Sequence, residues 1–346
     1  MENKIITLRP PVKEWVRPLL SLYSYWERAH RFALWTEDMR YRLEGKGGLD
    51  MFHVAVDKAN PVAALDVSVS RSDQRVGCLH RLFVHPEHRH QGLARSLLKH
   101  AVERFRIGGG ELLLLNSGWD TGIYHLYQDF GFREIRNDPW SDGVLMGRTV
   151  SGRSLSEWTE GYFQPQEPVK VVQLTLGHWA PLMLLCNQPL PYLVHHYALS
   201  ILGDWAVDGR LLGLFDAMET GKADALGLET PQGALVGFAT LMPYLDPWPV
   251  ASYQQHIRVL DLWVHPHFMQ YTPKLLSELL LQTQPLPSEV RHLVSYVETS
   301  RRELCQKFEE DGWRSVAQLD QRYQLPDGQT VDMVIYRRDN PAFVSA

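Results

Sequence analysis

The stretch Val84-His85-Pro86-Glu87-His88-Arg89-His90-Gln91-Gly92-Leu93-Ala94 decides the fold that we expect for this chain. It joins an apolar strand at 77–84 to an amphipathic helix that begins at Leu93. The first amides of a helix lack partners within the helix and carry partial positive charge, so they suit a phosphate group. Gly92 has no side chain to hold a phosphate away, and Arg89 can add a charged contact. By itself, R-x-x-G-x-A is equally typical of an ordinary turn.

The elements around this stretch alternate between strands and helices. Strands are expected at residues 5–8, 52–57, 62–70, 77–84, 112–115, 132–135 and 144–149. Helices are expected at 13–26, 36–43, 93–105 and 121–130. This order predicts an α/β domain of about 150 residues.

The order and motifs of these elements resemble the GNAT superfamily of N-acetyltransferases. The residues that carry the resemblance are Val84, Pro86, Arg89, Gly92, Ala94, Leu126, Tyr127, Gly131 and Phe132. The resemblance covers residues 5–150 in element order, and its motifs lie between residues 77 and 132. It implies a mixed, mostly antiparallel twisted sheet flanked by helices. It also implies that two central parallel strands, at 79–84 and 112–115, splay apart around acetyl-CoA.

The resemblance further implies which residues contact acetyl-CoA. Main chain near Leu82, Phe83 and Val84 would bind the pantetheine. The loop would bind the phosphates through Arg89, His90, Gln91, Gly92, Leu93 and Ala94. The family often has Asn seven residues before the tyrosine, where this chain has Asp120, and that departure leaves one contact open.

Acetyl transfer to an amine needs a base for the amine and an acid for the departing thiolate, because an alkylammonium has a pKa of about 10.4. Tyr127 matches the position where many family members place the acid. A tyrosine that merely packs in the core is the alternative.

The strand at 77–84 lacks the glutamate that many GNAT enzymes carry there, and offers His80 instead. The run Leu79-His80-Arg81-Leu82-Phe83-Val84-His85 is similar to the equivalent strand of arylalkylamine N-acetyltransferases, in which a histidine helps to deprotonate the amine. Strand alternation places Cys78, His80 and Leu82 on one face. A hydrogen-bonded structural imidazole fits His80 equally well.

In this superfamily the first two helices shape much of the acceptor pocket. Here they are rich in aromatic residues: Tyr23, Tyr25, Trp26, Phe32, Trp35 and Tyr41. Glu37 and Asp38 could attract a cationic amine. The same aromatic spacing is also what a helix–helix core would show.

Several classes of site and partner are disfavoured. His85, His88 and His90 lie in the phosphate loop, and no Cys or Asp completes a ligand set with them, so we expect no metal. A net charge of −5 and a pI near 6.3 give no basic face for nucleic acid. Three distant cysteines, no signal peptide and no apolar run of about 20 residues favour a cytoplasmic protein without a membrane partner. A homodimer stays open.

The second half of the chain repeats the first. The run Leu82–Pro86 returns as Leu262–Pro266, 180 residues later, and Asp129–Phe132 returns as Glu310–Trp313, 181 residues later. An amphipathic stretch at 275–281 and an apolar strand at 293–297 lie between them in the matching order. This indicates an internal duplication.

The second copy has lost the loop residues. Met269, Thr272 and Lys274 stand at the positions of Arg89, Gly92 and Ala94, and Phe308 replaces the tyrosine. We therefore predict a GNAT acetyltransferase domain at 1–150, a linker or strap at 151–168, and a degenerate GNAT-like domain at 169–346.

The predicted activity is acetyl transfer from acetyl-CoA to a primary amine of a small molecule or peptide. A non-catalytic acyl-CoA-binding or scaffold protein is the first alternative. A peptidoglycan-type aminoacyl transferase is the second, although the acidic net charge and the intact loop argue against it.

Overall fold

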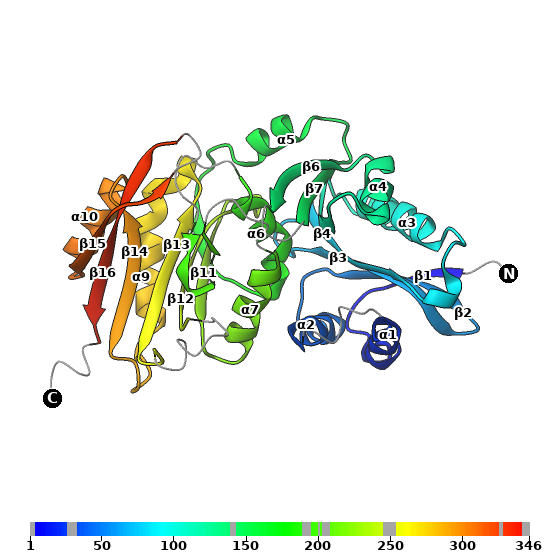
Figure 1. Cartoon of the computed structure of the whole chain (residues 1–346), viewed down its shortest axis with the longest axis horizontal. Coiled ribbons are helices and arrows are strands. Elements are labelled where there is room, and N and C mark those ends of the chain that lie inside the picture. The colour runs from blue at the N-terminus through cyan, green and yellow to red at the C-terminus, as the bar shows by residue number, and fades with distance from the viewer. Residues whose placement is uncertain are drawn as a thin grey trace.

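The chain forms two sheets that lie side by side along its long axis (Figure 1). The computed structural model describes residues 4–25, 33–138, 143–188, 195–199, 201–202, 208–244, 254–324 and 328–340. Each sheet has seven strands, and helices flank both. The predicted α/β class, with two tandem sheets, is confirmed.

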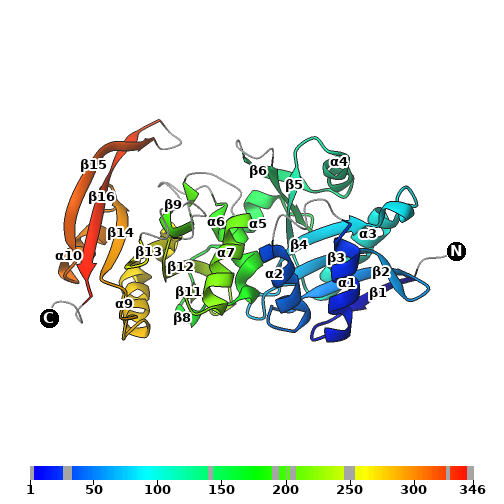
Figure 2. The ribbon, with the colours of Figure 1, turned by 60° about the horizontal axis from the view of Figure 1, so that its bottom comes forward.

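The first sheet has the strand order β1-β2-β3-β4-β5-β7-β6. Its strands are β1 Lys4–Leu8, β2 Met51–Asp57, β3 Asn60–Val69, β4 Val76–Val84, β5 Leu112–Gly118, β6 Arg133–Asp138 and β7 Gly143–Thr149. Pairing is parallel between β4 and β5 and antiparallel between the other neighbours. Its helices are α1 Val16–Tyr23 and α2 Ala33–Leu43 on one face, and α3 Leu93–Ile107 and α4 Gly122–Asp129 on the other (Figures 1 and 2).

The second sheet repeats this topology, in the order β8-β11-β12-β13-β14-β16-β15. Its strands are β8 Lys170–Gln173, β11 Asp224–Glu229, β12 Leu235–Met242, β13 Ile257–Val264, β14 His292–Glu298, β15 Arg314–Gln324 and β16 Thr330–Asp339. Its helices are α6 Trp179–Cys186, α7 Asp208–Glu219, α9 Thr272–Gln282 and α10 Arg302–Glu310, with a two-stranded pair β9 His195–His196 and β10 Ile201–Leu202 beside them. The helix and strand predicted near 275–281 and 293–297 are present, and β13–β14 is again a parallel pair.

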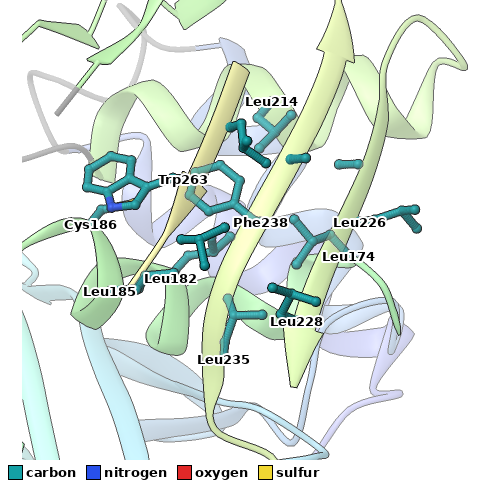
Figure 3. Close-up of a cluster of buried hydrophobic side chains, with 14 of the residues drawn as sticks. Leu174, Leu182, Leu185, Cys186, Leu214, Leu226, Leu228, Leu235, Phe238 and Trp263 are labelled. Atoms are coloured by element: carbon teal, nitrogen blue, oxygen red, sulfur yellow. The ribbon is translucent and has the colours of Figure 1, made fainter. Parts of the chain in front are cut away.

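Helix α6 lies between the two sheets (Figures 1 and 2). Every residue of α6 is buried, as expected of a helix that is apolar on all sides. It packs against β3, β4 and β5 of the first sheet and against β12 of the second. Figure 3 shows Leu182, Leu185 and Cys186 of α6 facing Phe238 and Trp263 of the second sheet. The hydrophobic core is therefore continuous from one half to the other.

The segment predicted as a linker, residues 151–168, contains helix α5 Leu155–Tyr162, which its apolar pattern did not indicate. The signal was a capping box, since Ser154 and Glu157 cap each other's backbone amides. Trp158 donates to Glu111 of the first half at 2.7 Å, and Phe163 stacks on His265 of the second half at 4.4 Å. The segment thus contacts both halves of the chain.

Glycines allow the two halves to approach closely. Gly233, in the turn between β11 and β12, has φ +81°, and a Cβ there would lie 1.8 Å from the carbonyl oxygen of Ser72 in the first half. A Cβ on Gly177 would lie 3.2 Å from the Cα of Gly48. The halves are in backbone contact at both places.

We expect Gly233→Ala to destabilise the chain more than Gly221→Ala. Gly221 also has a positive φ, of +69°, but a Cβ there meets nothing within 4 Å. Gly221→Ala therefore measures the backbone cost alone, about 1 kcal/mol, whereas Gly233→Ala adds an overpacking cost of about 1–3 kcal/mol. Urea unfolding of both variants measures the difference. If both variants lose the same free energy of unfolding, the halves can move apart at the contact between Gly233 and Ser72 without an energetic cost.

Candidate functional site

The central strands of the first sheet separate into a fork. Strands β4 and β5 pair in register from Val76 with Leu112 to Leu79 with Leu115, and the pairing ends there. Beyond this point β4 continues against β3, while β5 continues against β7. The predicted splay is therefore present, and the edges of His80–Val84 and Asn116–Gly118 that face each other are open.

A β-bulge in β4 lies at the start of this fork. On β3, Asp66 opposes His80 and Ala64 opposes Phe83, so Leu65 faces two residues of β4 instead of one. Arg81 has φ +52°, in the left-handed region that non-glycine residues seldom adopt.

The bulge overturns one prediction, because it interrupts the alternation of faces along β4. Cys78 packs in the core that joins the two halves, whereas Leu82 packs with Leu79 on the α3 side of the sheet. Cys78, His80 and Leu82 therefore do not share one face.

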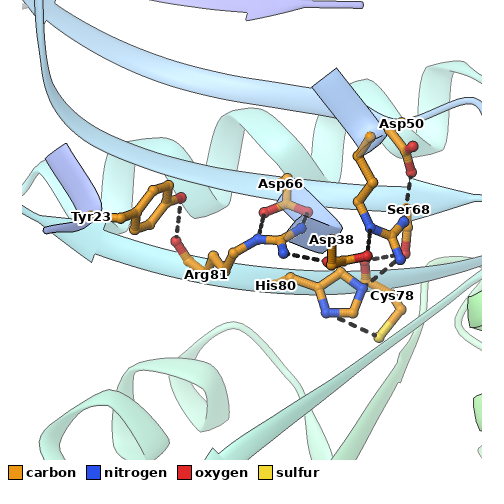
Figure 4. Close-up of polar contacts among 9 residues, drawn as sticks. Tyr23, Asp38, Asp50, Asp66, Ser68, Cys78, His80 and Arg81 are labelled. Atoms are coloured by element: carbon orange, nitrogen blue, oxygen red, sulfur yellow. Dashed lines mark hydrogen bonds and ion pairs between the residues drawn. The ribbon is translucent and has the colours of Figure 1, made fainter. Parts of the chain in front are cut away.

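A chain of buried ionic contacts holds the bulge (Figure 4). Arg81 makes a bidentate pair with Asp66, at 2.8 and 2.6 Å, and donates to Asp38 of α2 at 2.5 Å. Asp38 also pairs with Arg42, at 2.8 Å, and Arg42 pairs with Asp50 at 3.0 Å. Each of these five side chains is less than a tenth exposed.

This series of ionic contacts has three carboxylates for two guanidinium groups, and the pKa values of Asp38 and Asp50 reflect the excess of carboxylates. Burial acts to raise the pKa of Asp38, but Arg42 and Arg81 hold it below its usual value. Burial raises the pKa of Asp50 to about 6, against the opposing effect of Arg42, with Asp66 and Asp38 adding to the rise. As the pH falls, Asp50 therefore takes up a proton before Asp38 does.

His80 is the first residue of β4 past the fork. Its Nε2 lies 2.8 Å from the Ser68 hydroxyl, and its ring meets the Trp179 ring of α6 edge-on at 5.4 Å. Burial, together with the charges of Arg42 and Arg81, holds the pKa of His80 well below its usual value. The imidazole is therefore neutral near pH 7 and able to accept a hydrogen bond.

The predicted phosphate loop has the geometry of an anion site. His90 and Gly92 both have positive φ, of +60° and +76°, and a Cβ on Gly92 would meet nothing within 4 Å. No side chain caps α3, and its first backbone bond runs from Ser96 to the Gly92 carbonyl. In the part of the chain that the structure describes, the amides of Leu93 and Ala94 therefore have no acceptor.

The other loop residues are exposed. The guanidinium of Arg89 lies 6.0 Å from the Phe83 ring, and its Nε is 3.4 Å from the Val84 carbonyl oxygen. His90 and Gln91 project into solvent. Asp120, at the departure from the family pattern, has φ +51° and pairs with His125 at 3.0 Å.

Tyr127 lies in the core between α4 and the sheet. It is 5% exposed and packs edge-on against Phe132 at 5.8 Å, and its hydroxyl makes no hydrogen bond within the described ranges. Burial raises its pKa, so the phenol keeps its proton at neutral pH. Its neighbour Tyr124 differs, since its hydroxyl donates to Glu134 and accepts from Gln128.

The residues predicted for the acceptor pocket lie in different surroundings. Tyr23 is buried, and its hydroxyl donates to the Arg81 carbonyl at 2.8 Å, so it supports the bulge. Asp38 pairs with both Arg42 and Arg81, and Glu37 pairs with Arg40. Tyr25 is 55% exposed beside His85, at 4.3 Å. Trp26, Phe32 and the side chain of Trp35 lie outside the described residues.

A family comparison agrees with this geometry. Residues 48–134, which include the bulge, fork, loop and α4, match the family described as acetyltransferase (GNAT) domain. This GNAT match spans the central part of the first half of the chain. A search of curated proteins finds no match to the chain.

Solved structures match over about one GNAT domain's length. They include a putative acetyltransferase from Salmonella typhimurium, described with its cofactor acetyl-CoA (17% identity, TM-score 0.39, 50% of this chain and 95% of that chain). A ribosomal-protein-alanine N-acetyltransferase from Brucella melitensis matches at 18% identity and a TM-score of 0.40, over 49% of this chain and 99% of that chain.

The second sheet forks like the GNAT domain but lacks its other features. Strands β13 and β14 pair from Ile257 with His292 to Leu260 with Ser295, and β12 pairs with β13 without a register shift. The turn at Pro266–Tyr271 runs directly into α9, with Tyr271 and Thr272 both right-handed. In the second half, therefore, the strand pair β12–β13 beside the fork has no bulge, and the residues at the start of α9 are right-handed.

The strap covers this second turn. Phe163 stacks on His265, its carbonyl oxygen accepts from His267 at 2.8 Å, and Glu167 accepts from the Tyr271 hydroxyl at 2.9 Å. Phe308, at the position of the tyrosine, is fully buried. The place that corresponds to the phosphate loop is occupied by the chain itself.

Within the described ranges, no group of three or more His, Cys, Asp or Glu side chains could hold a metal ion. Among the helices that the structure describes, none is long and apolar enough to span a membrane.

We expect one acetyl-CoA site per chain, and we expect Gly92→Val to weaken it at least roughly tenfold, because the valine displaces the phosphate from one or more charge-assisted hydrogen bonds. The matched control is Gly109→Val, since Gly109 lies just beyond the other end of α3, has φ +86° and is equally open. Calorimetric titration with acetyl-CoA measures both variants. Two sites per chain, or equal losses in the two variants, would contradict the assignment.

Proposed function

We propose that the chain is an acetyl-CoA-dependent N-acetyltransferase that acts on a primary amine of a small molecule or peptide, with one working site in its GNAT domain. The observation that carries this proposal is the start of α3. There, two left-handed residues, His90 and Gly92, precede helix amides without partners. The corresponding turn of the second half is covered by the strap.

The residues of the first half fit acetyl-CoA. The amides of Leu93 and Ala94 would hold the pyrophosphate, with Arg89 as a mobile cation beside it. The open edge of β4 at Leu82–Val84 would pair with the amide groups of pantetheine. Acetyl-CoA supplies a thioester whose acetyl carbon forms the new bond to nitrogen as its bond to sulfur breaks.

Tyr127 and His80 are the proposed acid and base. Tyr127 would give its proton to the thiolate sulfur, since burial keeps the phenol protonated. His80 would take the proton that the amine nitrogen loses, and it is unprotonated at neutral pH, as a base must be. Ser68, 2.8 Å from Nε2 of His80, would fix the orientation of the ring.

The test of this function is release of free thiol from acetyl-CoA in the presence of an amine panel. The panel includes alkylamines, arylalkylamines, polyamines, α-amino amides and short peptides. Thiol release that depends on one class of amine supports the proposal. Acetyl-CoA binding without release for any class would favour the non-catalytic acyl-CoA-binding alternative.

We expect Tyr127→Phe to keep acetyl-CoA affinity and to slow transfer by roughly a hundredfold, the usual effect of losing a general acid. Tyr124→Phe is the matched control, because it removes a hydroxyl one helical turn away that already bonds Glu134. The kcat and the acetyl-CoA affinity of both variants are measured. Equal turnover in the two would assign Tyr127 to packing alone.

A further inference from the structure

The second half places an unpaired polar group next to the candidate base. Trp179, the first residue of α6, is 4% exposed. Its ring contacts His80, lies under the Arg42 guanidinium at 5.3 Å and stacks on Phe215 at 5.8 Å. Its Nε1 is fully buried and has no acceptor among the described residues. A buried N–H without a partner costs about 1–3 kcal/mol, so such groups are rare without a ligand or water.

The fork holds a second unpaired group, of the opposite kind. Asn116 is the first residue of β5 past the last pair, just as His80 is on β4. Cys78 and Leu114, paired with each other two residues earlier, both pack in the core that joins the halves, so strand alternation turns Asn116 to the same side. The Oδ1 of Asn116 is buried and has no donor among the described residues.

Helix α6 is common to both groups, because it carries Trp179 and packs against β5, the strand of Asn116. Helix α6 packs against both β4 and β5, and its first residue contacts His80. The side of the fork covered by the second half therefore offers a donor, an acceptor and a neutral imidazole. His80 itself is only partly buried.

We propose that the acceptor subsite is composite. Trp179 of the second half donates its indole N–H to an oxygen of the acceptor molecule, and Asn116 accepts from the amine that becomes acetylated. The inference rests on the proposed function of the fork. It assigns the substrate class as primary amines that carry a carbonyl oxygen on the neighbouring carbon, as α-amino amides and peptide N-termini do.

The electrostatics of the fork favour the same class. The effects that keep His80 neutral also make it a weak base. An α-amino group has a pKa of about 8, against about 10.4 for an alkylamine, so it loses its proton to a weak base more readily.

The direct test observes the Trp179 N–H itself. The chain has 11 tryptophans, so a ¹H–¹⁵N spectrum shows 11 indole signals, and Trp179→Phe identifies one by its loss. We expect this signal to shift when acetyl-CoA-loaded protein is titrated with glycinamide and to stay in place with propylamine. The control signal is that of Trp313, whose Nε1 is equally buried and unpaired but lies beyond α10, next to Phe308.

Kinetics give a second readout. We expect Trp179→Phe to lower kcat/KM for glycinamide by roughly tenfold more than kcat/KM for propylamine, because only glycinamide loses the hydrogen bond. Trp313→Phe should change neither, and acetyl-CoA affinity should hold in both. Asn116→Leu should lower kcat/KM for both amines, whereas Asn116→Asp should retain it. If Trp179→Phe does not fold, the kinetics of the Asn116 pair still test the subsite.

The outcomes separate the two proposals. If the Trp179 signal does not shift with any amine of the panel, the composite subsite is overturned, even where thiol release shows transfer. Equal kinetic effects on glycinamide and propylamine overturn it as well. A signal that shifts with glycinamide, without thiol release, supports the subsite and refutes the transferase.

Discussion

The buried ionic chain from Asp66 to Asp50 is the interaction on which the candidate site depends. Arg81 adopts a left-handed backbone conformation that costs roughly 1–2 kcal/mol for a residue with a Cβ. Its guanidinium is held by Asp66 and Asp38, so the strain is opposed by contacts that fix this group from two sides. Without them β4 would pair regularly with β3, and the residues past the fork would face the other way.

The second half has the same fold without the ionic contacts and without the bulge that they hold. Its β13 pairs with β12 in unbroken register, and Asp261, one residue past the last pair of its fork, accepts backbone N–H groups of Tyr197 and Ala198 and pairs with His196. There a carboxylate supports a neighbouring turn, while in the first half the ionic chain supports a bulge. Under the proposed function, the same topology serves a ligand in one half and packing in the other.

Sequence patterns predicted the parts of the site that depend on local chemistry. Gly92 and the residues around it were recognisable because a helix start and a left-handed glycine are read from neighbouring residues. The fork followed from the resemblance, and the repeat from two short matches in the same order. These features could be inferred from the sequence because they depend on few long-range contacts.

The features that were missed depend on residues far apart in the chain. The bulge at Arg81 comes from side chains on α2 and β3, so period-two alternation placed Leu82 on the wrong face. Asp38 was read as a candidate for attracting an amine, because its sequence neighbours do not show that Arg42 and Arg81 already occupy it. Trp179 lies 99 residues after His80, and nothing local connects the two.

The strap that covers the second turn has a consequence for ligand competition. Phe163 and Glu167 are joined to that turn by the chain itself, so they act at an effective concentration on the order of millimolar. A phosphate-bearing ligand would have to exceed that concentration, weighted by its own affinity, before it displaced them. The covered turn therefore behaves as a self-inhibited copy. Under the proposed function, raising the level of acetyl-CoA would saturate the first half long before it could reopen the second.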